Sequence, residues 1–201
     1  GYYQDDYDKV FPEWLAKAKK GDKKYQFYIA KTYQFGQGVQ KDLYKSFEWY
    51  IKSSDQGYAL ASNNLAFFYS DGQIFDKNFK KKFQLLCEAA TGGLLMAKSA
   101  LGVIYFFGDG VEPDDQEAFK WFKTSADLGF ADAQYYLGQM YSYGKGVELD
   151  YQEAFKWYKK SADQGVADAQ NSVGYFYNRG YGVPSDFEKA EKYYRLAAEQ
   201  G

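Results

Sequence analysis

Residues 130–165 read FADAQYYLGQMYSYGKGVELDYQEAFKWYKKSADQG, and this stretch of 36 residues decides the fold. Its first half places small or apolar residues on one face of a helix: Ala133, Leu137, Gly138 and Tyr141. Its second half repeats the helical spacing with alternating large and small residues: Ala154, Trp157, Tyr158, Ser161 and Ala162. The stretch therefore predicts two helices joined by a short turn.

The turn between these two helices has its own chemistry. Gly144 and Gly146 are suited to the left-handed conformation at a helix C-terminus, and Val147 can fold back over the last turn. Asp150 stands where the second helix begins and is an expected N-cap. Glu153 follows three residues later, which resembles a reciprocal capping box. Asp114 and Glu117 show the same spacing.

The same pattern recurs along the chain at an exact period of 36 residues. Five units follow without insertion or deletion: 22–57, 58–93, 94–129, 130–165 and 166–201. Each unit has a tyrosine at position 12, namely Tyr33, Tyr69, Tyr105, Tyr141 and Tyr177, and an Asx residue at the expected cap, namely Asp42, Asn78, Asp114, Asp150 and Asp186. Each unit also closes on a glycine, from Gly57 to Gly201. The period predicts a repeat protein rather than a domain with one central core.

The second unit and the N-terminal segment depart from the pattern. In the second unit Ile74 replaces a turn glycine, Lys82 replaces a small residue, and Leu85 with Leu86 replaces the aromatic pair, so we expect slightly different packing there. Residues 1–21 precede the repeats. Because Trp14, Ala18 and Gly21 fall where a second helix would end, residues 8–21 are expected to form a capping helix.

The pattern L-G-x-x-Y-x-x-G-x-G-V, Asp, A-x-x-W-Y-x-x-(S/A)-A-x-x-G resembles the Sel1-like repeat (SLR), a relative of the tetratricopeptide repeat. The resemblance covers residues 22–201. It implies an all-α fold, a right-handed α-solenoid of five helix-turn-helix repeats whose first helices line a concave face. It further implies an adaptor or scaffold for other proteins. Bacterial members are often exported, and act in host contact or in neutralising a secreted effector. A cysteine-rich subgroup is linked to penicillin binding, but Cys87 is the single cysteine here.

If the first helices line a groove, positions 6, 10, 13 and 14 of each repeat face into it. The candidate partner-binding residues combine aromatic rings with amide and hydroxyl groups, as protein interfaces do. They are Phe27, Lys31, Gln34, Asn63, Phe67, Ser70, Val103, Phe106, Tyr135, Gln139, Ser142, Asn171, Tyr175 and Asn178. Phe67 and Tyr135 are expected to serve binding rather than stability.

Several of these aromatic rings have an alternative interpretation. In this alternative, Phe35, Phe107 and Tyr143, beside the turns, pack between adjacent repeats, since aromatic stripes at helical spacing are often core. The five position-12 tyrosines are equivalent copies, and their repetition favours packing over catalysis. Cys87 is expected to be a buried thiol.

The composition argues against several classes of function. The chain has no histidine, which excludes Ser-His-Asp and Cys-His pairs and the usual zinc ligand sets. No phosphate-binding G-x-x-x-x-G-K-[ST] loop occurs, and acidic residues such as Asp114 have simpler roles as caps. We therefore expect no enzyme, no cofactor and no metal site. With 25 basic and 27 acidic residues, the charge does not favour nucleic acid or anionic lipid as a partner. No apolar run is long enough to cross a bilayer.

Two functional hypotheses remain. The first is a non-catalytic scaffold that binds a partner protein, such as a secreted toxin that it neutralises or a host factor. The second is a carbohydrate or peptidoglycan-binding module whose groove aromatics stack on sugar rings. The sequence begins at Gly1 without an initiator methionine, which leaves room for a removed signal peptide. The sequence alone does not fix the compartment; a periplasmic or secreted location is favoured over a cytoplasmic one. The oligomeric state is open.

Overall fold

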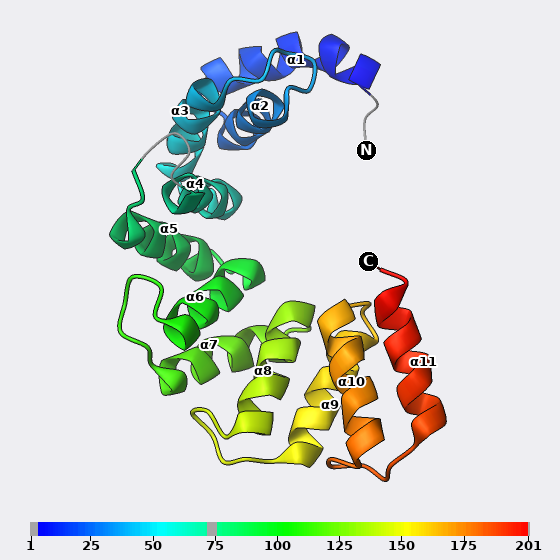
Figure 1. Cartoon of the computed structure of the whole chain (residues 1–201). Coiled ribbons are helices and arrows are strands. Elements are labelled where there is room, and N and C mark those ends of the chain that lie inside the picture. Colours follow the sequence, from blue (N-terminus) through cyan, green and yellow to red (C-terminus); the bar gives the residue numbers. More distant parts are fainter. Residues whose placement is uncertain (1–3, 72–75, 201) are drawn as a thin grey trace. The chain divides into compact units, whose positions relative to one another are not determined.

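The computed structural model describes residues 4–71 and 76–200, and within them every regular element is a helix. The elements are α1 Gln4–Lys19, α2 Lys23–Phe35, α3 Leu43–Ser54, α4 Ala59–Asp71, α5 Phe79–Thr91, α6 Leu95–Phe107, α7 Asp115–Asp127, α8 Ala131–Tyr143, α9 Tyr151–Ala162, α10 Ala167–Arg179 and α11 Phe187–Ala198. The predicted all-α fold of five helix-turn-helix repeats behind a leading helix is confirmed (Figure 1). None of the helices in these ranges is long and apolar enough to cross a membrane. Two predicted features, Ile74 and Gly201, lie outside the described residues.

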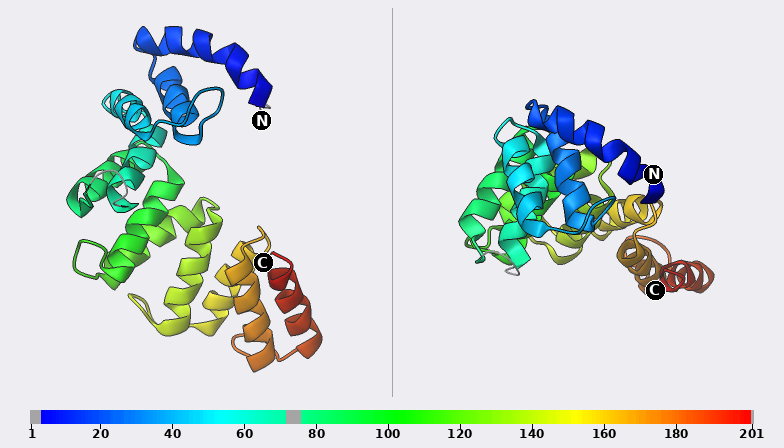
Figure 2. Two further views of the ribbon diagram at one scale, coloured as in Figure 1. Left: turned by 45° about the horizontal axis from the view of Figure 1, so that its top comes forward. Right: turned by 90° about the horizontal axis from the view of Figure 1, so that it is seen from above.

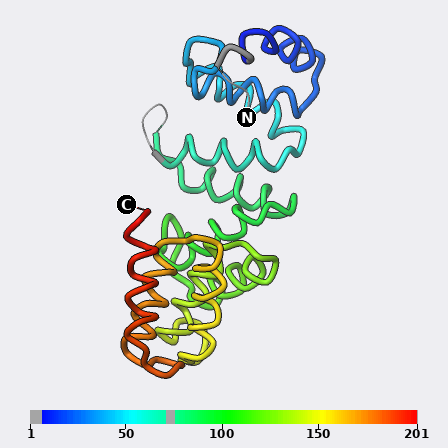
Figure 3. The backbone as a smooth tube through the Cα atoms, turned by 90° about the vertical axis from the view of Figure 1, so that its right-hand side faces the viewer, coloured from blue at the N-terminus to red at the C-terminus, as the bar shows by residue number. Residues whose placement is uncertain are grey.

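The chain forms two compact units, Gly1–Ala97 and Lys98–Gly201. In the first unit, each helix from α1 to α5 packs against the next one along the chain. In the second unit, the same holds from α7 to α11. The hairpin of α10 and α11 runs antiparallel in Figures 1 and 2, and in Figure 3 the two helices again lie side by side.

Each repeat begins its second helix with the predicted Asx cap. The side chains of all five cap residues accept hydrogen bonds from backbone amides of the first helical turn. The backbone N–H of the same residue donates to the carbonyl of the position-12 tyrosine, for example from Asp150 to Tyr141 at 3.0 Å. The four other repeats make this bond at 2.9–3.1 Å: Asp42 to Tyr33, Asn78 to Tyr69, Asp114 to Tyr105 and Asp186 to Tyr177. The bond fixes the length of every turn.

This backbone bond explains why the predicted capping box is wrong. A reciprocal box needs the glutamate side chain to accept from the backbone amide of the cap residue. In the structure the amides of Asp114 and Asp150 already donate to tyrosine carbonyls. The carboxylates of Glu117 and Glu153 instead form exposed ion pairs with the lysines three residues further on.

The glycines of the turn serve two purposes. Gly144 ends α8 with φ +66°, in the left-handed region, and its amide donates to the Met140 carbonyl. Gly146 also has φ +66°, but it additionally lies against the backbone of Asp115 at the start of α7. Val147 packs against the core, as predicted. The turn therefore ends one helix and also contacts the preceding repeat.

Large rings of the second helices pack over glycines of the first helices. A Cβ added at Gly102 would lie 2.7 Å from the Phe122 ring, and one at Gly138 would lie 2.7 Å from the Tyr158 ring. Gly174 lies against Tyr194 in the same way. The absence of a side chain at these positions is what lets the two helices of a hairpin approach so closely.

The position-12 tyrosines pack, as predicted. Four of them contact a phenylalanine of the preceding second helix, with centroid distances from 5.2 to 5.8 Å: Tyr33 with Phe11, Tyr69 with Phe47, Tyr141 with Phe119 and Tyr177 with Phe155. The fifth, Tyr105, packs against a core cluster of the second unit. Burial raises the pKa of Tyr69 and Tyr141, which keeps their hydroxyls protonated.

The leading helix α1 takes the place of a second helix. Phe11 contacts Tyr33 as Phe119 contacts Tyr141. A Cβ at Gly38 would lie 2.8 Å from the backbone of Tyr7, just as Gly146 lies against Asp115. Helix α1 is therefore the second half of a repeat, and it covers the first repeat as expected.

The second and third repeats lack a hydrogen bond that the other three repeats share. In the first, fourth and fifth repeats, glutamine side chains at positions 5 and 35 bond to each other at 2.7–2.8 Å: Gln26 with Gln56, Gln134 with Gln164, and Gln170 with Gln200. The second repeat has Ser62 and Gly92 at these positions, and the third has Lys98 and Leu128. In the second repeat, Leu85 and Leu86 are buried in place of the aromatic pair. The division between the two units falls where this bond is absent.

Two of the caps should be sensitive to acid. Hydrogen bonding to Lys189 lowers the pKa of Asp186, and hydrogen bonding to Lys45 lowers that of Asp42. Because the folded-state pKa is the lower one, each carboxylate contributes stability above its unfolded pKa, and that contribution is lost as pH falls through the folded value. We expect Asp186→Asn, a cap like Asn78, to show a smaller loss of melting temperature than the wild type as the pH falls below the ordinary pKa of an aspartate, about 3.9. Circular dichroism measures this, and an equally steep loss in both proteins would contradict it.

Candidate functional site

A cavity of about 480 Å³ lies within the second unit, where α8 ends, α9 begins and α10 runs alongside. It is lined by Ser142, Tyr143, Tyr151, Tyr158, Asn171, Ser172, Tyr175, Phe176, Tyr181 and Tyr194. None of these side chains is charged, and six of them are tyrosines. We call this cavity the tyrosine pocket. Its volume lies in the range of known small-ligand sites, about 300–1,000 Å³.

One wall of the tyrosine pocket is made of stacked rings. Tyr151, the first residue of α9, stacks on Tyr181 with a centroid distance of 4.7 Å and an interplanar angle of 9°. Tyr175 of α10 meets Tyr181 edge to face at 5.8 Å. Tyr181 is placed there because Gly180 ends α10 in the left-handed conformation and turns the chain back.

The inner side of the pocket is formed by Tyr158. Its ring is buried over Gly138, and its hydroxyl lies 3.1 Å from the Ser142 hydroxyl. Because Ser142 gives its one proton to the carbonyl of Gln139 at 2.9 Å, Tyr158 is the donor to Ser142. Burial raises the pKa of Tyr158 well above its ordinary value, so this donor stays protonated.

The rim carries the groups that are open to a ligand. Asn171 is exposed, and its amide makes no hydrogen bond among the described residues. Tyr175 is 43% exposed, and the guanidinium of Arg179 lies 5.7 Å from its ring. Tyr143 is 69% exposed. The pocket thus offers ring faces for stacking and a free amide that can donate and accept.

The structure brings three of the predicted binding residues together here: Ser142, Asn171 and Tyr175. The sequence interpretation missed Tyr151 and Tyr181, which make the stacked wall. They stand at positions 22 and 16 of the repeat, outside the first helix on which the prediction concentrated. Their positions in the sequence carried a signal: Tyr151 directly follows the cap residue Asp150, and Tyr181 directly follows Gly180, the first turn glycine of the next repeat.

Other predicted residues of the second unit are half-buried or packed. Tyr135 accepts a hydrogen bond from Gln139 at 2.7 Å, and its ring packs on Tyr158 with centroids 5.8 Å apart. Tyr135 therefore contributes to stability, contrary to the expectation that it serves binding alone. Val103 and Phe106 pack against a core cluster. Asn178 is half-buried, and its backbone carbonyl accepts from Ser185.

In the first unit, the prediction that Phe27 is a binding residue is wrong. It is 7% exposed and packs against Tyr28, Tyr50 and Tyr58, so its ring is part of the core and not of a binding surface. Gln34 also has an internal partner, because its side-chain oxygen accepts from the Tyr50 hydroxyl at 2.7 Å.

The remaining predicted residues of the first unit are more open. Phe67 is 60% exposed. Lys31 is half-buried, with its Nζ about 6 Å from the rings of Phe27 and Phe35. Asn63 and Ser70 are half-buried: the Asn63 amide lies 3.4 Å from the Asn64 side chain, and the Ser70 hydroxyl donates to the Phe67 carbonyl.

The rings beside the turns are exposed rather than packed between repeats. Phe35, Phe107 and Tyr143 each expose more than half of their surface. The alternative interpretation of these three rings as filler between repeats is therefore wrong. Large exposed rings are a feature of protein-binding surfaces.

Comparison with known proteins identifies the repeat. The model of the Sel1 repeat matches this chain five times, at residues 24–58, 59–94, 95–130, 131–166 and 167–201. The chain belongs to the Sel1 repeat family. No curated protein sequence matches it significantly.

Two solved Sel1 structures are similar over nearly the whole chain. A protective antigen of uropathogenic Escherichia coli, c5321, with an SLR fold, is 33% identical, with a TM-score of 0.88 over 94% of this chain. The match spans only 40% of that antigen's length. A Sel1 repeat protein from Oxalobacter formigenes is 27% identical, with a TM-score of 0.87, and the match covers 98% of this chain and 81% of that one.

An immunity protein of Pseudomonas aeruginosa, PA5088, shares the fold. It is 22% identical, with a TM-score of 0.65 over 96% of this chain and 74% of its own. The Sel1 repeat typically builds a protein-interaction scaffold. Sel1 repeat proteins bind other proteins.

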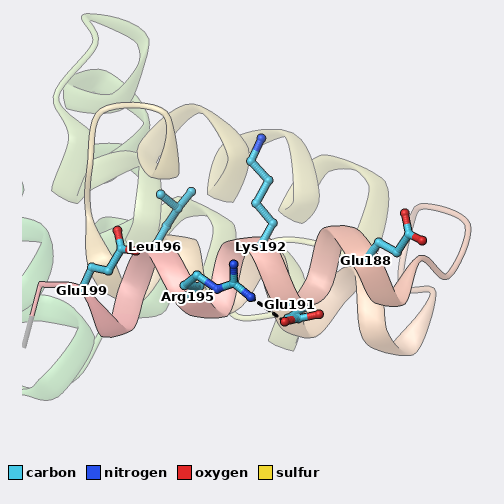
Figure 4. Close-up of a pocket in the computed structure, with 6 residues that line it drawn as sticks. All are labelled: Glu188, Glu191, Lys192, Arg195, Leu196 and Glu199. Atoms are coloured by element: carbon cyan, nitrogen blue, oxygen red, sulfur yellow. Dashed lines mark hydrogen bonds and ion pairs between the residues drawn. The ribbon is translucent and has the colours of Figure 1, made fainter.

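The last Sel1 repeat also carries a hollow of about 220 Å³ on α11, shown in Figure 4. Its lining is charged, with Glu188, Glu191, Lys192, Arg195 and Glu199 around Leu196. Glu191 forms an exposed ion pair with Arg195 at 2.6 Å, and it stands where the earlier repeats have a phenylalanine. Exposed charged side chains contribute little binding energy, so the tyrosine pocket is the better candidate site.

Proposed function

We propose that this Sel1 repeat protein is a non-catalytic scaffold that binds a partner protein, and that the tyrosine pocket is a contact site for it. The observation that carries the proposal is the combination of exposed tyrosine rings with the free amide of Asn171 around a cavity without charged lining. Tyrosine supplies a large, rigid contact area and a hydroxyl, and it is enriched where binding energy concentrates.

The solved relatives support the class of partner that we propose. Immunity proteins of Pseudomonas aeruginosa share the fold, and a protective antigen of Escherichia coli shares a third of the aligned residues. We therefore favour a bacterial protein whose partner is a secreted effector that it neutralises, or a host protein. Both roles fit a periplasmic or secreted location, which stays a proposal.

The test is affinity capture from native lysate with three forms of the chain. We expect the wild type to retain a discrete protein and the double variant Asn171→Ala, Tyr175→Ala to lose it. With purified partner, two contact residues of this kind should raise Kd by about 100-fold, or about 2.7 kcal/mol. Leu128→Ala is the matched control, because Leu128 is an exposed apolar residue of the same unit that does not line the pocket.

A carbohydrate is the alternative ligand for the tyrosine pocket. The same rings and amide could stack on a sugar and bond its hydroxyls. Isothermal titration with chitin and peptidoglycan fragments tests this directly. Saccharide binding that the double variant abolishes, with no protein retained by the wild type, would replace the proposal with a carbohydrate-binding function.

A further inference from the structure

A second pocket lies in the first unit, between α1 and α2. It has a volume of about 290 Å³ and is lined by Tyr7, Trp14, Tyr25, Tyr28, Lys31, Thr32 and Gln37. Trp14 and Tyr28 form one wall, with centroids 5.2 Å apart, and Tyr25 meets Tyr28 edge to face at 6.0 Å. We call it the lysine pocket.

The lysine pocket is the repeat equivalent of the tyrosine pocket. Six of its lining positions match six of the other, each pair 144 residues or four 36-residue repeats apart: Tyr7 and Tyr151, Trp14 and Tyr158, Tyr28 and Ser172, Lys31 and Tyr175, Thr32 and Phe176, Gln37 and Tyr181. The repeat geometry thus builds the same hollow twice, once in each unit.

The third equivalent place, between α7 and α8, keeps the same ring pair as the lysine pocket. Tyr136, equivalent to Tyr28, stacks on Phe122, equivalent to Trp14, with centroids 4.8 Å apart. The ring pair is therefore common to these two places, and the residues around it give each place its own chemistry.

The lysine pocket differs from the tyrosine pocket in charge. Lys31 replaces Tyr175, and no carboxylate lies within ion-pair distance of its Nζ among the described residues. Lys24 lies beside the Tyr28 ring, with Nζ 5.8 Å from its centroid, and is likewise unpaired by any described carboxylate. Lys17, on the other side of Tyr25, differs from these two lysines because it forms an ion pair with Glu13 at 2.7 Å.

The wider charge distribution has the same sign. Residues 1–97 hold 14 lysines and 11 acidic residues, a net charge of +3. Residues 98–201 hold 11 basic and 16 acidic residues, a net charge of −5. An anion is therefore attracted to the first unit and not to the second.

From these observations we propose that the lysine pocket is a second binding site, which takes a carboxylate side chain carried by a peptide segment. The Lys31 ammonium meets the carboxylate, and the Gln37 amide and tyrosine hydroxyls supply further donors. The aromatic walls hold the apolar neighbours of the carboxylate. A phosphate group fits less well, because residues 1–97 contain no arginine and the pocket offers one ammonium.

This proposal goes beyond the proposed function, since a different pocket in the other unit carries it. The test uses the purified full chain labelled with ¹⁵N and a synthetic peptide, acetyl-Glu-Phe-Glu-amide, with acetyl-Gln-Phe-Gln-amide as the uncharged match. Trp14 lies in the pocket wall, so its indole N–H signal reports binding; Trp14→Phe assigns the signal. The four tryptophans give separate signals, and that of Trp49 in α3 should not move.

We expect the glutamate peptide to shift the Trp14 signal to saturation, and Lys31→Gln or the glutamine peptide to raise Kd by about tenfold. Lys52→Gln, an exposed lysine beside Trp49 outside the pocket, should leave Kd unchanged. An equal Kd for both peptides, no effect of Lys31→Gln, or no shift at millimolar peptide would overturn the proposal. So would saturation of the Trp14 signal by inorganic phosphate without any response to the peptide.

Discussion

Replacing Gly146 by alanine should lower the free energy of unfolding by about 3 kcal/mol, because two costs add at this position. Gly146 has φ +66°, where a residue with a Cβ pays about 1–2 kcal/mol. The added Cβ would also collide with the backbone carbonyl of Asp115, at the start of the preceding repeat's second helix. A backbone atom cannot rotate away as a side chain can, so the two repeats must separate.

A matched glycine divides the two costs. Gly165 also has a positive φ, +93°, but a Cβ there would meet no atom within 4 Å. Gly165→Ala should therefore cost only the backbone strain, about 1 kcal/mol. Urea unfolding of the two variants measures the difference. If both lost the same stability, the close approach of the turn to the preceding repeat would not stabilise the stack.

The second large effect is expected from Phe122→Ala, which should cost about 4 kcal/mol. The Phe122 ring is fully buried, covers Gly102 and stacks on Tyr136 of the next repeat. Its removal leaves a cavity between two repeats and takes away the ring that both share. Neighbouring repeats are stabilised mainly by such interfaces, so the loss should exceed that of an ordinary surface position.

Phe107→Ala is the control for this prediction. Phe107 is a phenylalanine of the same unit, but its ring is 63% exposed, and its removal should change stability by less than about 0.5 kcal/mol. Thermal unfolding followed by circular dichroism compares the two. A small loss for Phe122→Ala would mean that neither the packing over Gly102 nor the stacking on Tyr136 of the next repeat stabilises the fold.

The sequence predicted the features that depend on local chemistry. The five Asx caps, the left-handed glycine at Gly144 and the packing of Tyr141 all follow from residue type and spacing, and all are present. The capping box failed because the competing bond, from Asp150 to the Tyr141 carbonyl, crosses a turn of eight residues. A pattern of neighbouring residues does not show such a bond.

The candidate site was harder to predict for a similar reason. Helical spacing gives the side of α2 on which Phe27 lies, but not that Tyr50 and Tyr58 cover it. Likewise, Tyr151 and Tyr181 are far apart in sequence and are stacked only because the turn after α10 folds back over the start of α9. The pocket arises from contacts between repeats, and those contacts depend on side chains outside the motif.

The central claim is that a protein chain occupies the tyrosine pocket. Photo-crosslinking tests it most directly, with benzoylphenylalanine in place of the exposed rim residue Tyr143 and, as control, in place of Leu128. In native cells, position 143 should yield one discrete protein adduct that position 128 does not. Equal adducts from both positions, or none from position 143 while glycan fragments bind the purified chain, would contradict the account.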